Sequence, residues 1–145
     1  MLGRMTSIGL LAFAFAATAV ASDIDKKIVA LAGVVPDRSF VLMDVPDAHD
    51  FIANKMLIVS LNAGSSSDAA QQIVGQLLQP SSKPFAVLGR NDAVAAATLR
   101  RALRELKGKG GAVGEVAFIG DKKFQRDLSK IAAEANVTLI YAAYP

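Results

Sequence analysis

Five short apolar runs, separated by amphipathic stretches, constrain the fold of this chain more than any other feature of its sequence. They cover residues 39–45, 56–61, 84–89, 115–120 and 137–143. Four of them are nearly continuous in apolar residues and do not alternate with polar ones, which is typical of strands in a sheet that helices cover on both faces. We therefore expect about five strands in a mostly parallel sheet.

The stretches between the runs carry apolar side chains at the three- and four-residue spacing of amphipathic helices. We expect helices over residues 22–33, 46–55, 65–79, 91–107 and 121–134. Strands that alternate with helices favour right-handed crossovers and a single three-layer α/β/α sandwich with helices on both faces. A doubly wound sheet of flavodoxin-like size is the preferred interpretation, and a mixed sheet of the thioredoxin-like type is the alternative.

Residues 1–21 have the layout of a secretory signal peptide. Arg4 precedes an apolar run from Ile8 to Val20, and small residues end the segment at Ala19 and Ala21. A retained membrane anchor is the alternative, but the run is shorter than the roughly 20 residues that a spanning helix needs. We expect a periplasmic or secreted protein with one α/β domain over residues 22–145.

The composition excludes several classes of function. The chain of 145 residues has no cysteine, so it has no disulfide, no thiol nucleophile and no thiolate metal site. A net charge of +3 and 6% aromatic residues give little for binding a phosphate backbone or stacking on bases. We expect no nucleic-acid partner, no cofactor, no bound metal, and no membrane span after the signal peptide is removed.

The segment MLIVSLNAGSSSDAAQQ, residues 56–72, has the pattern of an apolar strand, a Gly/Ser turn and a helix start. Such a turn suits an anion, because glycine allows close backbone approach and the first amides of a helix are unpaired. Capping alone accounts for each of these residue types, so a capped helix that binds nothing is the preferred interpretation. The candidate ligand-binding residues are Asn62, Gly64, Ser65, Ser66, Ser67, Arg90 and Asp44.

The part LIVSLNAGSSS is similar to the N-terminal signature of acetate kinases, in which Asn-x-Gly-Ser-Ser-Ser follows an apolar strand near the phosphate site. The resemblance covers about a dozen of 145 positions. It ends after the serines, where Asp68, Ala69 and Ala70 stand in place of the Lys or Glu of that family. Those kinases also have two domains and are several times larger. We therefore interpret the likeness as convergent turn chemistry and transfer no function.

The segment DVPDAHD places the only histidine, His49, among Asp44, Asp47 and Asp50. Histidine and carboxylates suit zinc or manganese, but the spacing matches no known ligand motif, and such residues at a helix start are usually a solvated cap. Asp44 at a strand end, with His49, also raises the alternative of a small phosphatase-like hydrolase. There is no Gly-x-Ser-x-Gly elbow that would indicate a serine hydrolase.

The long helix expected over residues 91–107 is basic toward its end. Arg100, Arg104 and Lys107 are spaced by four and three residues, so they form one exposed stripe, which Glu105 interrupts. Such a stripe suits anionic lipid, polysaccharide or an acidic partner. Basic residues late in a helix also simply complement its dipole.

These observations favour a non-enzymatic role. The leading hypothesis is an exported domain that interacts with another envelope protein, for example in an envelope, secretion or transfer assembly. The alternatives are a small-anion or phosphorylated-ligand binding module that uses residues 62–68, and the small hydrolase.

Overall fold

The computed structural model describes residues 23–79, 83–110 and 114–145. The predicted signal peptide lies outside these residues. In chain order the elements are α2 (Asp23–Val34), β1 (Val41–Val45), α3 (Phe51–Asn62), α4 (Asp68–Leu78), β2 (Phe85–Gly89), α5 (Asp92–Gly108), β3 (Gly114–Gly120), the short 3-10 helix η1 (Lys122–Phe124), α6 (Gln125–Glu134) and β4 (Val137–Ala143).

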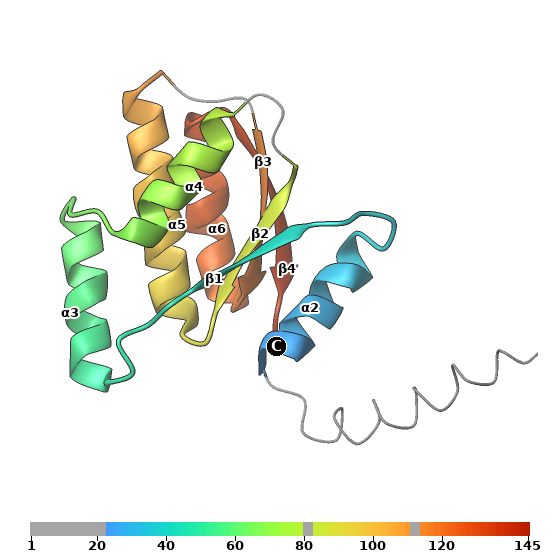
Figure 1. The fold of residues 1–145 in the computed structure, drawn as a ribbon, viewed down its shortest axis with the longest axis horizontal. Coiled ribbons are helices and arrows are strands. Elements are labelled where there is room, and N and C mark those ends of the chain that lie inside the picture. Colours follow the sequence, from blue (N-terminus) through green and yellow to red (C-terminus); the bar gives the residue numbers. More distant parts are fainter. Residues whose placement is uncertain (1–22, 80–82, 111–113) are drawn as a thin grey trace, which may run out of the picture.

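The four strands form one parallel sheet in the order β1-β2-β3-β4 (Figure 1). In the register, Val41 lies opposite Phe85, Phe85 opposite Val116, and Val116 opposite Leu139. The predicted α/β/α sandwich is confirmed, with four strands in place of the expected five.

The helices are divided unequally between the two faces of the sheet. Figure 1 shows α3, α4, α5 and α6 on one side of the sheet and α2 on the other. Right-handed crossovers between strands that follow one another in order place every connecting helix on the same face. The strand order does not reverse among the described strands. The preferred doubly wound arrangement is therefore not found there, and α2 covers its face alone.

The core is split by the sheet into two clusters. On the side of α4, α5 and α6, Val87 and Phe118 pack with Leu99 and Leu103 of α5. On the side of α2, the next residues along the strands, such as Leu88, pack with Leu31. All five residues of β2 are buried, which is why that run shows no alternation.

The expected strand at residues 56–61 is wrong, because these residues are the second half of α3. Asp50 caps the helix by accepting a hydrogen bond from the Ile52 amide at 3.1 Å. No helix-ending residue follows until Gly64, whose φ is +110°. The side of α3 that includes Leu61 is buried, while Met56 is exposed although it is apolar. A short run that is apolar on all sides does not distinguish a helix from a strand.

Candidate functional site

The Gly/Ser turn connects α3 to α4, so a helix precedes it where a strand was expected. Two of its three hydroxyls are engaged within the protein. The Ser67 hydroxyl caps α4 by accepting from the Ala70 amide at 3.1 Å, and the Ser66 hydroxyl accepts from the Gln71 side chain at 2.8 Å. The Ser65 amide donates to a carbonyl of α3 at 3.0 Å. These contacts are those of a helix cap.

The residues that lead into this turn contact the basic part of α5. Arg100 donates to the side-chain oxygen of Asn62 at 2.6 Å, and Arg101 donates to the Gly64 carbonyl at 3.0 Å. Arg90 lies elsewhere, at the turn between β2 and α5, and lines a separate cleft at the carboxyl ends of the strands. The structure therefore does not bring Arg90 together with the Gly/Ser turn.

The segment with the single histidine serves the start of α3. Asp44 is exposed on β1, on the strand face opposite to the buried Val45. His49 has a φ of 62°, and its Nδ1 lies 3.3 Å from the Asp47 carboxylate. Asp50 is the cap of α3. Within the described residues no group of three or more histidine, aspartate or glutamate side chains is placed to hold a metal ion.

A cleft of about 500 Å³ lies where the carboxyl ends of the strands meet the start of α5 and η1. Its inner wall holds Lys27 of α2, which is only 3% exposed. The Lys27 ammonium donates to the Gly89 carbonyl at 2.5 Å and makes a short ion pair with Asp92. The second oxygen of Asp92 accepts from the Asp121 amide at 2.9 Å.

Tyr141 of β4 extends this arrangement, because its hydroxyl donates to the Asp121 carbonyl. Burial, with the nearby charges of Asp92 and Asp121, raises the pKa of Tyr141 above that of an ordinary tyrosine. Gly120 is required here, since a Cβ at that position would lie 2.7 Å from the Phe118 ring. We call Lys27, Asp92, Asp121 and Tyr141 the strand-end network. It ties α2 on one face of the sheet to α5 on the other.

Sequence reasoning missed the strand-end network. The available signal was the place of Lys27 on the apolar side of α2, three residues after Ile24 and four before Leu31. A lysine at such a position must reach a partner or leave its charge buried. The carboxylate, ammonium and hydroxyl groups of the network all have protein partners. We therefore interpret the network as a stabilising contact between α2 and α5.

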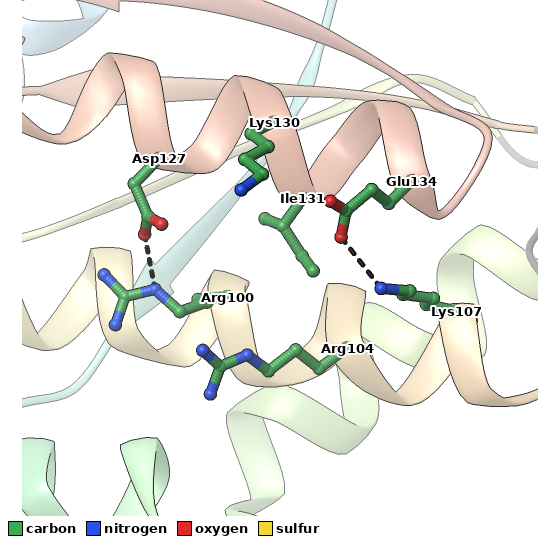
Figure 2. A pocket seen from close by; sticks show the side chains of 7 residues that line it. All are labelled: Arg100, Arg104, Lys107, Asp127, Lys130, Ile131 and Glu134. Atoms are coloured by element: carbon green, nitrogen blue, oxygen red, sulfur yellow. Dashed lines mark hydrogen bonds and ion pairs between the residues drawn. The ribbon is translucent and has the colours of Figure 1, made fainter.

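A groove of about 360 Å³ lies between α5 and α6 on the outer side of the helical layer (Figure 2). An ion pair stands at each end of it: Arg100 with Asp127 at 2.6 Å, and Lys107 with Glu134 at 2.9 Å. We call it the α5–α6 groove. It contains the basic stripe that the sequence predicted, now paired with a second helix.

A second open surface lies on α3, where four apolar side chains face away from the rest of the protein. The exposed fractions are 73% for Phe51, 67% for Ile52, 67% for Met56 and 66% for Val59. A shallow apolar groove of about 330 Å³ runs among the last three of them and the neighbouring Lys55. We call these four residues the α3 apolar face. Sequence reasoning missed it because it assigned half of the helix to a buried strand.

Comparisons with known proteins give no relative for this chain. No protein-family model, no curated protein and no solved structure matches it. In the described parts of the chain, no helix is long and apolar enough to cross a membrane.

Proposed function

We propose that this chain is an exported, non-catalytic interaction domain that docks onto another protein of the cell envelope through the α3 apolar face. The observation that carries the proposal is the exposure of Phe51, Ile52, Met56 and Val59 on one side of a single helix. Soluble domains rarely leave such a group of large apolar side chains in water unless another molecule covers it.

The composition of the α3 apolar face supports a protein partner. Aromatic side chains and methionine are enriched in the buried centres of interfaces, where charged residues are depleted. Phe51 and Met56 are of these types. Lys55 lies beside them, with its ammonium 5.1 Å from the centre of the Phe51 ring. The expected signal peptide is the reason for placing the partner in the envelope.

The other sites support this proposal indirectly. The hydroxyls of Ser66 and Ser67 in the Gly/Ser turn and the groups of the strand-end network are already engaged within the protein. Asp44 and His49 have no contact with each other among the described residues that would indicate a catalytic pair. The small-anion module and the hydrolase stay as predictions without a specific observation in their favour.

Photo-crosslinking from two matched positions tests the proposal. A photoreactive amino acid replaces Met56 in one variant and Val29 in another. Val29 lies on α2, across the sheet, and is 70% exposed, so the two positions are equally accessible. In cells of the native host, we expect position 56 to capture one defined exported protein and position 29 to capture none.

Three outcomes contradict the proposal. The same products at both positions would show that the captures are non-specific. Absence of any product at position 56 would show that nothing covers the α3 apolar face. A product of twice the mass of the chain would identify a second copy and not another envelope protein as the partner.

A further inference from the structure

The α5–α6 groove is framed by matched positions on two helices. Arg100 and Lys107 are seven residues apart on α5, and Asp127 and Glu134 are seven residues apart on α6. Because seven residues make two helical turns, the two ion pairs form the two ends of the groove, as Figure 2 shows. A hydrogen bond from Arg100 to Asn62 further fixes one end.

Two cations lie between these ends without a counter-charge of their own. Arg104 and Lys130 make no ion pair within 4.0 Å among the described residues. Within the described ranges, the hydrogen bond of Arg104 is a long one of 3.4 Å to the Asn62 carbonyl. Lys130 is close enough to Glu134 for its charge to lower the pKa of that carboxyl, although the hydrogen bond from Lys107 has the larger effect.

The floor between the two cations is apolar. Ile131 of α6 lines the groove at its centre and is 9% exposed (Figure 2). The groove therefore offers two unpaired positive charges above an apolar patch, with both ends already neutralised. This arrangement is complementary to carboxylates that are attached to an apolar chain.

We propose that the α5–α6 groove binds an acidic segment of a partner protein, whose carboxylates pair with Arg104 and Lys130 while an apolar side chain rests on Ile131. The guanidinium of Arg104 is suited to a bidentate carboxylate contact, and Lys130 supplies a point charge beside it. Since the ion pairs already hold the ends of the groove, part of the ordering cost of binding is removed in advance.

A protein segment fits the groove better than an anionic membrane or a polysaccharide. Asp127 and Glu134 are already paired with Arg100 and Lys107 at the two ends, so an extended anionic surface would find uncompensated positive charge only at the centre and carboxylates beside it. A short acidic segment avoids this repulsion, because its carboxylates need to occupy only the centre.

This inference rests on the proposed interaction role and gives the chemistry of the partner. An interface of standard size involves about 20 to 30 residues on each side, so the four side chains of the α3 apolar face supply only part of one. The groove adjoins the end of the same helix, α3. Asn62, one turn beyond Val59 on α3, contacts Arg100 and Arg104 of the groove.

A titration of the full chain with a defined peptide tests the inference. The probe is a fluorescein-labelled peptide of Glu and Leu residues, and fluorescence anisotropy measures its binding at low ionic strength. We expect saturable binding that weakens about ten-fold in the Arg104→Gln, Lys130→Gln double variant, through loss of two charge-assisted contacts. The matched peptide of Gln and Leu lacks the carboxylates. It should bind the original protein no more tightly than the Glu and Leu peptide binds the double variant.

A control variant separates the groove from general electrostatics. Lys26→Gln with Lys122→Gln removes the same two charges from exposed positions on α2 and η1, and the acidic peptide should bind it within two-fold of the original protein. Thermal unfolding by circular dichroism checks that both double variants fold.

Several results would overturn the inference. An equal loss of affinity in both double variants would show only non-specific attraction. Absence of saturable peptide binding, or binding of phosphatidylglycerol vesicles or dextran sulfate through Arg104 and Lys130 in its place, would reject the acidic segment. The peptide titration uses no cellular partner. Its result can therefore be interpreted even if the crosslinking from position 56 fails.

Discussion

The strand-end network and the α5–α6 groove are built from the same kinds of charged side chain but differ in what holds those charges. Lys27 of the network is 3% exposed and has two protein acceptors. The groove is open to solvent, and its central cations Arg104 and Lys130 lack ion-pair partners among the described residues. The charged groups of the network all have partners within the protein, whereas two cations of the groove have no ion-pair partner among the described residues.

This difference separates a stabilising role from a binding role. A buried charge must be paired, because desolvation without a partner costs several kcal/mol. An exposed cation is solvated by water, so it gains little from an intramolecular partner and stays available to another molecule. We therefore expect changes in the network to alter stability and changes in the groove to alter binding.

The largest expected effect is that of Lys27→Met, which keeps the apolar stem and removes the charge. It leaves Asp92 without its counter-ion near the start of α5. The side chain of Asp92 is 23% exposed, so we expect a loss of about 2–3 kcal/mol in the free energy of unfolding, at or below the lower end of the range for broken buried pairs. Urea unfolding measures it.

Two further variants sharpen this test. Lys26→Met changes the neighbouring exposed lysine and should lie within about 0.5 kcal/mol of the original protein. Adding Asp92→Asn to Lys27→Met removes the orphaned charge, so the double variant should be more stable than Lys27→Met alone. If the second change gives no recovery, the loss comes from packing and not from the ion pair.

An intermediate effect is expected at Tyr141 of the network. Tyr141→Phe removes the hydrogen bond to the Asp121 carbonyl and should cost about 1 kcal/mol at neutral pH. The pKa of Tyr141 is raised in the folded protein, mainly by burial. Its contribution is therefore complete below about pH 10, the pKa of an unfolded tyrosine, and is lost as pH rises toward the folded-state pKa.

Urea unfolding at a series of alkaline pH values checks this sign. The original protein should lose stability more steeply above about pH 10 than Tyr141→Phe does. Tyr144→Phe changes the other tyrosine of the chain and is the matched control. Parallel curves for the original protein and Tyr141→Phe would contradict the assignment.

The fold was predictable where sequence patterns are local. Buried parallel strands such as 84–89 and 115–120 show as apolar runs, and Asn91 caps α5 as its residue type predicts. Helix α4 begins at Asp68 with Ser67 as its cap, three residues after the expected start at residue 65. The failure came at residues 56–61. Helix α3 is apolar on its exposed side as well as its buried side, so its periodicity is lost, and that loss is itself the mark of an unpartnered surface.

The candidate sites were less predictable, because they depend on pairing between distant elements. The stripe of Arg100, Arg104 and Lys107 is visible in one helix. Which of these cations are neutralised depends on Asp127 and Glu134 of α6, and therefore on how two helices pack. Lys27 and Asp92 are likewise 65 residues apart in sequence.

The smallest effect on stability is expected in the groove, for Asp127→Asn, and it should be accompanied by a gain in binding. The Arg100–Asp127 pair lies at the surface, with the Asp127 side chain 54% exposed, so its loss should cost no more than about 0.5 kcal/mol, and less in high salt. The same change removes a negative charge from one end of the groove and releases Arg100. The acidic peptide should therefore bind about two- to three-fold more tightly in anisotropy titrations at low ionic strength. A stability loss as large as that of Lys27→Met, or weaker peptide binding, would contradict the assignment of a stabilising role to the network and a binding role to the groove.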